Sequence, residues 1–142
     1  MRIAAAGATG NIGARTVSFL EQGGHVVVPI SRSLGVDLIT GQGLNGALEG
    51  VETVVDAISS PPIGPAETRA YLGTTTRNLL DAEERVGARH HVLLSIVGIH
   101  RIEGGTPHYS GKRRARAPGR DGPGAVDDCA GHPISRLRGV GY

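Results

Sequence analysis

The stretch Gly7-Ala8-Thr9-Gly10-Asn11-Ile12-Gly13 follows the apolar run Ile3–Ala6 and leads straight into a helical pattern. That pattern predicts a helix, because its members recur at three- and four-residue spacing: Ile12, Thr16, Phe19 and Leu20. A glycine-rich turn between a strand and a helix is typical of a phosphate-binding loop. Gly7 permits the tight turn, Gly10 lets a pyrophosphate approach the backbone, and Gly13 lets the helix pack close to the strand. The positive end of the helix dipole then faces the phosphates. We therefore predict a dinucleotide site here; the alternative is a purely structural turn.

The composition favours one domain, which we expect over residues 1–113 of the 142. No segment approaches the roughly 20 apolar residues of a membrane span, and the first apolar run breaks at Gly7, unlike a signal peptide. The single Cys129 excludes an internal disulfide. His90 and His91 have no cysteine or carboxylate pattern beside them, so we expect no metal site. A cytoplasmic protein without membrane contact is the expectation.

Strand and helix patterns alternate along the chain. Apolar runs predict strands at 25–32, 35–38, 51–59 and 89–97, and helical patterns occupy 41–48 and 66–85. This alternation predicts an α/β fold, a Rossmann-type doubly wound parallel sheet in three α/β/α layers. Ligands of such sheets bind beyond the carboxyl ends of the strands, which makes Ser59 a candidate contact.

Arg32 comes just after the second predicted strand, with Ser31 before it. In a doubly wound sheet this point lies beside the adenosine ribose. An acidic residue there would accept hydrogen bonds from a 2′-hydroxyl, whereas an arginine attracts a 2′-phosphate. Arg32 and Ser31 therefore predict a preference for NADP(H) over NAD(H), and the alternative is a solvated surface arginine.

Four segments resemble the short-chain dehydrogenase/reductase superfamily, and within it the atypical NmrA-like NAD(P)-binding proteins. They are AGATGNIG at 6–13, SRSLGVDL at 31–38, GTTTRNLLDAEERVGARHHVLLS at 73–95 and HYSGK at 108–112. The resemblance covers about residues 1–113. It implies that Thr9, Asn11 and Ile12 belong to the cofactor turn, and that Asp37, with Leu38 beside it, contacts the adenine.

The same resemblance implies a catalytic set. The family uses a Ser at the end of a strand to polarise a carbonyl, and a Tyr four residues before a Lys as the acid. Ser95 and Lys112 match, but the residue four before Lys112 is His108, and Tyr109 is three before it. Either could be the acid of an oxidoreductase acting on a small carbonyl or quinone-like substrate. The alternative is a non-catalytic NADP(H) sensor that regulates a partner protein.

Residues 114–142 do not continue the pattern. Residues 112–142 hold 7 Lys/Arg and 3 Asp/Glu, against 8 and 10 in residues 1–111, and no period continues beyond four residues. We therefore expect a disordered, irregular basic tail and a sheet that is incomplete at its C-terminal edge. The tail lacks interleaved aromatic residues, so a nucleic acid is not the expected partner.

A frameshift would explain the tail. With one choice of synonymous codons for residues 114–139, a shift of one base restores an amphipathic helix and an apolar strand. We therefore predict a frameshift near codons 113–114, which leaves the C-terminal part of the fold truncated. The product should then be marginally stable and bind cofactor weakly, because apolar area at the sheet edge stays uncovered.

Overall fold

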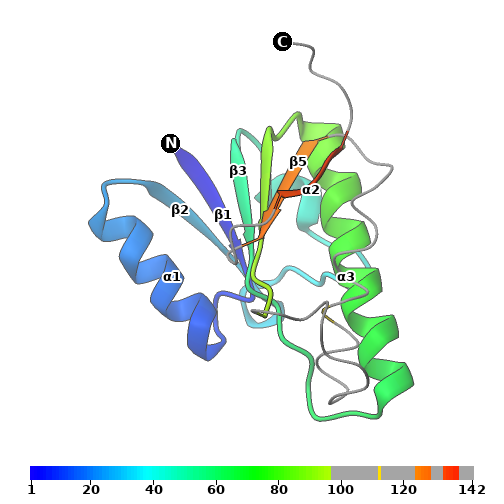
Figure 1. Ribbon diagram of the computed structural model, residues 1–142. Helices are drawn as coiled ribbons and strands as arrows, with labels where there is room; N and C mark the ends of the chain where they lie inside the picture. Colours follow the sequence, from blue (N-terminus) through cyan, green and yellow to red (C-terminus); the bar gives the residue numbers. More distant parts are fainter. Residues whose placement is uncertain (97–111, 113–123, 129–132, 138–142) are drawn as a thin grey trace.

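The computed structural model describes residues 1–96, 112, 124–128 and 133–137, which form one sheet with helices on both faces (Figure 1). The strand order is β2-β1-β3-β4-β5-β6, and all neighbours are parallel except β5 and β6. The strands are β1 (Arg2–Ala6), β2 (Val26–Ile30), β3 (Thr53–Asp56), β4 (His90–Leu93), β5 (Gly124–Asp128) and β6 (Pro133–Leu137). The helices are α1 (Asn11–Gln22), η1 (Arg32–Leu34), α2 (Leu44–Ala47) and α3 (Pro65–Val86). The predicted Rossmann-type α/β fold is confirmed.

The chain changes direction across the sheet at β1. Ala6 pairs with Ile30 of β2 on one side and with Asp56 of β3 on the other. The crossover through α1 therefore runs outward to β2, and the next crossover returns past β1 to β3. Crevices at such a switch point are where open α/β sheets bind ligands.

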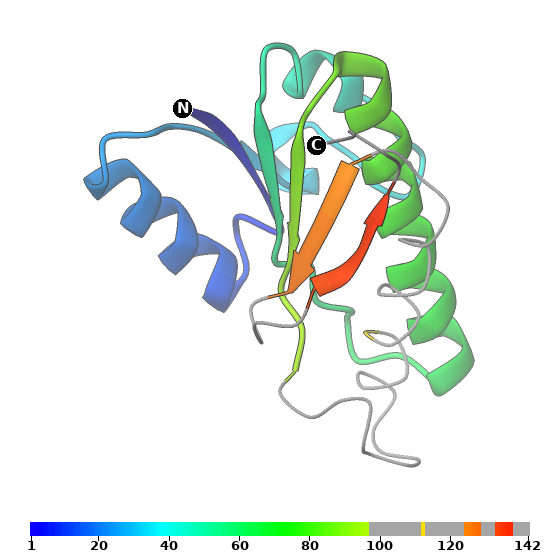
Figure 2. The same ribbon diagram turned by 45° about the horizontal axis from the view of Figure 1, so that its top comes forward.

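Small residues in β1 let helices approach the sheet from both sides. Ala4, Ala5 and Ala6 are fully buried. Helix α3 packs on one face, and α1 lies on the opposite side of the sheet (Figures 1 and 2). The apolar stripe expected on the long helix is confirmed, since Leu72, Leu79, Leu80 and Ala82 are buried and Val86 packs against the core.

Residues 35–38 do not form the predicted strand. Ile30 ends β2, η1 follows, and Gly35 turns the chain with φ at +85°. The N–H of Val36 then donates to the Ser31 carbonyl instead of to a neighbouring strand. Val36 and Leu38 are nevertheless buried, which explains their apolar character. The helix predicted at 41–48 is reduced to α2, because Gly41 and Gly43 both have positive φ.

Beyond β4 the structure adds strands where the sequence predicts none. β5 runs parallel to β4, with His91 opposite Val126, and β6 returns antiparallel to β5 (Figure 2). The expectation of an irregular stretch is therefore wrong at 124–128 and 133–137. The ladder joins backbone groups, and these pair along an open strand edge without needing a side-chain period.

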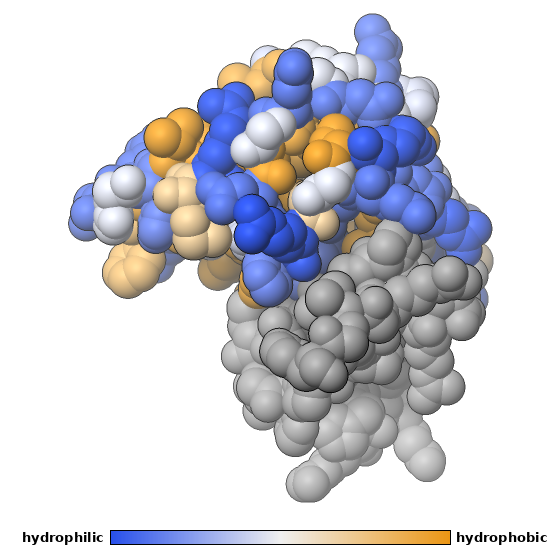
Figure 3. Space-filling model, turned by 90° about the horizontal axis from the view of Figure 1, so that it is seen from above, coloured by the Kyte–Doolittle hydropathy of each residue, from blue (hydrophilic) through white to orange (hydrophobic). Residues whose placement is uncertain are grey.

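Helix α1 is only lightly packed. Its sole buried residue is Gly13, and Phe19 is 77% exposed, so the predicted apolar pattern does not all face the sheet. When the molecule is viewed from above the orientation of Figure 1, apolar side chains reach the surface in separate places among polar ones (Figure 3). Scattered exposure of this kind is common in proteins. Among the described residues, no helix has the length and apolar character to cross a membrane.

Candidate functional site

The glycine turn after β1 is held by backbone contacts that leave no room for side chains. Gly7 has φ at +78°, and a Cβ there would lie 2.9 Å from the Ala57 carbonyl oxygen. A Cβ on Gly13 would lie 2.0 Å from the Gly7 carbonyl oxygen. A Cβ on Gly10 would meet that same oxygen at 3.2 Å, and the Gly10 N–H donates to it at 2.9 Å. Gly7 and Gly13 therefore cannot be replaced by a larger residue without a backbone shift. At Gly10 a Cβ would fit tightly.

The turn opens onto the N-terminus of α1. Gly10 is the N-cap and has no side chain to offer, and the first helical bond to it comes from Ala14. Within the part of the chain that the structure describes, the N–H groups of residues 11–13 have no hydrogen-bond partner. Three N–H groups at the positive end of a helix form an anion site.

A cavity of about 640 Å³ runs along the carboxyl ends of β1, β2, β3 and β4. Its volume falls within the roughly 300–1,000 Å³ of small-molecule sites. Among its lining residues are ten of the eleven predicted cofactor contacts: Gly7, Thr9, Gly10, Asn11, Ile12, Ser31, Arg32, Asp37, Leu38 and Ser59. Gly13, the eleventh, is buried beneath the turn and supports it instead. One cavity thus gathers predicted contacts from three separate parts of the chain, at 7–12, 31–38 and 59.

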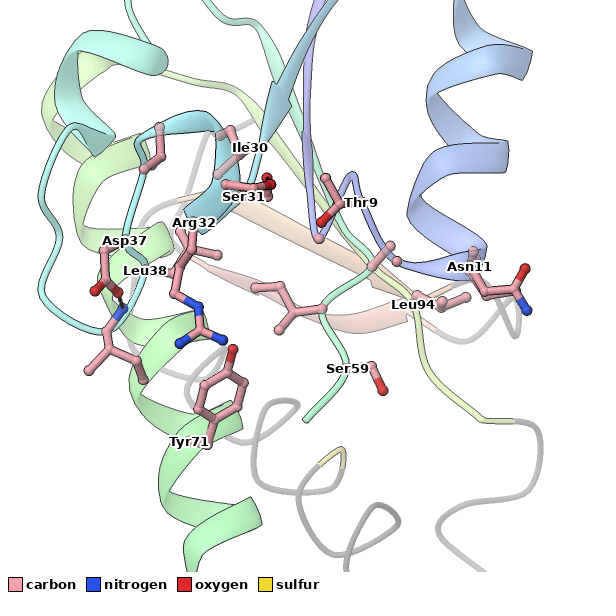
Figure 4. Close-up of a pocket in the computed structure, with 18 of the residues that line it drawn as sticks. Thr9, Asn11, Ile30, Ser31, Arg32, Asp37, Leu38, Ser59, Tyr71 and Leu94 are labelled. Atoms are coloured by element: carbon pink, nitrogen blue, oxygen red, sulfur yellow. Dashed lines mark hydrogen bonds between the residues drawn. The ribbon is translucent and has the colours of Figure 1, made fainter. Parts of the chain in front are cut away.

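A positive charge lies at the end of the cavity away from the glycine turn. Arg32 is exposed and extends from the end of β2 into the cavity, where Tyr71 reaches in from α3 (Figure 4). With the other described residues, the Arg32 guanidinium makes no hydrogen bond or ion pair. Ser31 is buried, and its hydroxyl lies 3.0 Å from that of Ser33. A free guanidinium beside hydroxyl groups suits a phosphate ligand.

The loop that carries Asp37 is fixed from both sides. One Asp37 carboxylate oxygen accepts the N–H of Ile39 at 2.8 Å (Figure 4). The side-chain amide of Asn78, on α3, donates to the carbonyls of Leu38 and Ile39, at 2.9 Å each. Asp37 therefore keeps a second carboxylate oxygen for a ligand at a defined place in the wall.

The predicted catalytic residues are only partly described. Lys112 is 3% exposed and lines the cavity. Ser95 is half-buried just after β4, where its neighbour Leu94 lines the cavity and Ser95 does not. His108 and Tyr109 lie outside the described residues. Among the described residues no group of His, Cys, Asp and Glu could hold a metal ion.

Behind the cavity lies a buried polar cluster of Asp56, Thr76, Glu83 and His91. His91 Nδ1 lies 2.8 Å from a Glu83 oxygen, and its Nε2 lies 3.9 Å from Asp56 Oδ2. Burial lowers the pKa of His91, but the hydrogen bond to Glu83 and the charges of Glu83 and Asp56 outweigh it, so the pKa is raised. Burial also raises the pKa of Glu83, against the opposing effect of His91. The cluster therefore favours a protonated His91 between the two acids.

Sequence reasoning missed eight lining residues: Ile30, Ser33, Val36, Ile39, Ala57, Ile58, Tyr71 and Leu94. Most adjoin predicted contacts in the chain, so widening each predicted segment by a residue or two would have found them. Tyr71 is different, because it lies in α3, and the segment at 73–95, which begins two residues later, is not one of those predicted to contact the cofactor. Only the packing of α3 against the sheet brings it to the cavity.

No protein-family model and no curated protein sequence matches this chain. Solved structures do resemble it. A short-chain dehydrogenase/reductase superfamily protein from Agrobacterium tumefaciens, with bound NAD, superimposes with a TM-score of 0.69 at 23% identity, over 90% of this chain and 48% of that one. The UDP-N-acetylglucosamine 4-epimerase of Bacillus cereus gives 0.67 at 19% identity, over 82% and 51%.

A third structure, the GDP-D-glycero-L-gluco-heptose synthase of Campylobacter jejuni in the presence of NADPH, gives a TM-score of 0.67 at 18% identity. It is matched over 83% of this chain and 41% of its own. The chain thus spans about half the length of these structures. At such low identities the shared feature is the fold, which is the Rossmann-type fold of these proteins.

Proposed function

We propose that this chain binds a nicotinamide dinucleotide as a short-chain-reductase-like oxidoreductase. The observation that carries the proposal is the glycine turn. It excludes any Cβ at Gly7 and Gly13, and it leaves the N–H groups of Asn11 and Ile12 without a hydrogen-bond partner among the described residues, beside a cavity that Arg32 also lines. The fold shared with proteins solved with NAD or NADPH supports the same ligand class.

The cofactor would lie across the carboxyl ends of the strands. The turn at residues 7–13 would hold the pyrophosphate, and Asp37 would meet the adenine. Arg32, with Ser31, would contact a 2′-phosphate, which makes NADP(H) the preferred cofactor. Bound NADP(H) would supply hydride chemistry. Lys112 would hold the nicotinamide end, and Ser95 would polarise the oxygen of a small carbonyl or quinone-like substrate.

A binding titration tests the proposal. The full chain is titrated with NADPH and with NADH, and binding is followed by nicotinamide fluorescence. We expect NADPH to bind more tightly. Arg32→Ala should weaken NADPH binding about tenfold, which is the effect of about 1.4 kcal/mol and is typical of one lost charged hydrogen bond, and leave NADH unchanged.

Arg77→Ala is the matched control, because Arg77 is also exposed and does not line the cavity. Absence of binding by either cofactor at millimolar concentration would reject the proposal. Equal losses for NADPH and NADH in Arg32→Ala would reject the 2′-phosphate contact alone. A panel of carbonyls and quinones then distinguishes an oxidoreductase from a non-catalytic NADP(H) sensor, since the sensor binds NADPH without oxidising it.

A further inference from the structure

The buried polar cluster behind the cavity is not used by the proposed chemistry. Asp56, Thr76, Glu83 and His91 come from β3, α3 and β4, and each is at most 5% exposed. Burying two carboxylates beneath a sheet is costly unless they are paired and hydrogen-bonded. The cost of burying these charges must be offset by favourable interactions of the cluster. Those interactions extend to the cavity wall.

Asp56 connects the cluster to the turn. One of its carboxylate oxygens, Oδ2, accepts the Thr76 hydroxyl at 3.0 Å. The other, Oδ1, accepts the backbone N–H of Ile58 at 2.9 Å. Ile58 and Ala57 line the cavity, and theirs is the backbone that Gly7 touches, at 2.9–3.1 Å from a Cβ built on Gly7. The Asp56 carboxylate therefore fixes the surface against which the turn packs.

His91 completes the pairing. A neutral His91 would face two buried carboxylates. With its proton on Nδ1, its Nε2 would direct a lone pair at Asp56, and this Nε2 has no hydrogen-bond partner among the described residues. In its protonated form Nδ1–H donates to Glu83, and Nε2–H points toward Asp56. The charged groups that act on His91 in the described part of the chain are Glu83 on α3, Asp56 on β3 and Lys112. Lys112 opposes the proton and the two acids favour it.

We propose that Asp56 is a positioning residue for the dinucleotide turn. Its carboxylate accepts the Thr76 hydroxyl, faces the His91 ring at 3.9 Å, and fixes the backbone of Ala57 and Ile58 beneath Gly7. The inference rests on the proposed function, because the turn is taken to hold the pyrophosphate. The buried polar cluster would then affect cofactor affinity through the position of the turn, although the cluster lies behind the cavity.

Two adjacent threonines provide a matched test. Thr75 and Thr76 are both buried in α3, but the Thr75 hydroxyl bonds within its own helix, to the Tyr71 and Leu72 carbonyls, and only Thr76 reaches Asp56. In the full chain, Thr76→Val and Asp56→Asn should weaken NADPH binding about tenfold, the equivalent of one buried hydrogen bond to a charged group at about 1.4 kcal/mol. Thr75→Val should bind NADPH as the unchanged chain does.

The pH profile is a readout that a general loss of packing would not move. We expect the NADPH affinity of the unchanged chain to fall at alkaline pH, with the midpoint at which His91 loses its proton in an NMR titration of the imidazole. Asp56→Asn removes one of the two charges that hold this proton, so the midpoint should move to lower pH. Thr75→Val should keep the original midpoint.

Each outcome decides the inference. If the unchanged chain binds NADPH and both Asp56→Asn and Thr76→Val match Thr75→Val in affinity and pH profile, the inference is overturned. If Asp56→Asn does not fold, Thr76→Val decides alone. If the unchanged chain binds no dinucleotide, the proposed function fails. Amide hydrogen exchange then decides the positioning effect: faster exchange at Ile58 and Gly10 in Thr76→Val than in Thr75→Val supports it, and equal exchange overturns it.

Discussion

Replacing Gly13 by alanine tests the geometry of the turn directly. The new Cβ would lie 2.0 Å from the Gly7 carbonyl oxygen, 2.6 Å from the Gly7 carbonyl carbon and 3.1 Å from the Ala8 Cα. All three neighbours are backbone atoms, so no side chain can rotate away. The distance from the new Cβ to this oxygen must increase from 2.0 Å to at least 3.0 Å, below which such contacts are essentially never found. The turn and the helix therefore have to separate.

The expected loss follows from two opposing effects. Alanine is better than glycine inside a helix by about 1 kcal/mol, whereas a forced backbone shift costs about 1–3 kcal/mol and occasionally more. Because the clash here is with backbone on every side, we expect the upper end and a net loss of about 2 kcal/mol. That loss lowers the urea midpoint by about 1 M for a small domain. NADPH affinity should fall at least about tenfold, since a hydrogen bond to a charged group contributes about 1.5–3 kcal/mol.

Urea unfolding of the full chain measures the first effect, and nicotinamide fluorescence the second. Gly46→Ala is the matched control. Gly46 lies in α2, a Cβ there has no neighbour within 4 Å, and its φ is not positive. It should raise the unfolding free energy by about 0.5–1 kcal/mol and leave binding unchanged. If Gly13→Ala unfolds at the same urea concentration as Gly46→Ala and binds NADPH normally, the packing argument is refuted.

Three further predictions concern other parts of the chain. Asn78→Ala removes both hydrogen bonds to the Leu38 and Ile39 carbonyls and should cost about 1–2 kcal/mol in urea unfolding, with faster amide exchange at Ile39; an unchanged exchange rate would contradict it. His91 holds its proton above its ordinary pKa of 6.5, so its contribution to stability is complete below pH 6.5 and is lost as the pH rises through the raised pKa. Glu83→Gln should reduce this alkaline loss, and identical pH profiles would oppose the assignment. Sequencing of the DNA should reveal an inserted or missing base near codons 113–114, and an intact frame whose codons cannot give the shifted helix and strand rejects the frameshift.

The parts of the fold that the sequence predicts well are those set by local chemistry. The turn at residues 7–13 combines glycine spacing with an apolar run before it and a helical pattern after it. Helix α3, predicted at 66–85 and found at Pro65–Val86, has an apolar stripe, Pro65 at its start and Gly87 at its end with φ at +76°. Each of these signals lies within a few residues of the structure that it specifies, so no tertiary contact is needed to interpret it.

The parts that the sequence predicts poorly depend on contacts between distant segments. Residues 35–38 carry buried apolar side chains, which suggests a strand, but Gly35 and the Asn78 amide hold them as a loop. His91 has no acidic neighbour in sequence, yet Glu83 and Asp56 approach it from α3 and β3. Strands β5 and β6 form because β4 offers an open edge for backbone pairing, more than because of any alternation of their own side chains. In each case the deciding partner is remote in the chain.

The alanines of β1 explain why this site relies on polar contacts for its rigidity. Ala4, Ala5 and Ala6 allow close approach of the layers but bury little apolar area, and apolar stabilisation scales with the area removed from water. The strand that begins the turn is therefore weakly anchored by packing alone. The Ala57 N–H donates to the Ala6 carbonyl at 3.0 Å, and Asp56 fixes the next residue of the same segment through Ile58. Directional hydrogen bonds thus supply the fixed geometry that a phosphate site needs, beside a strand whose buried side chains are small.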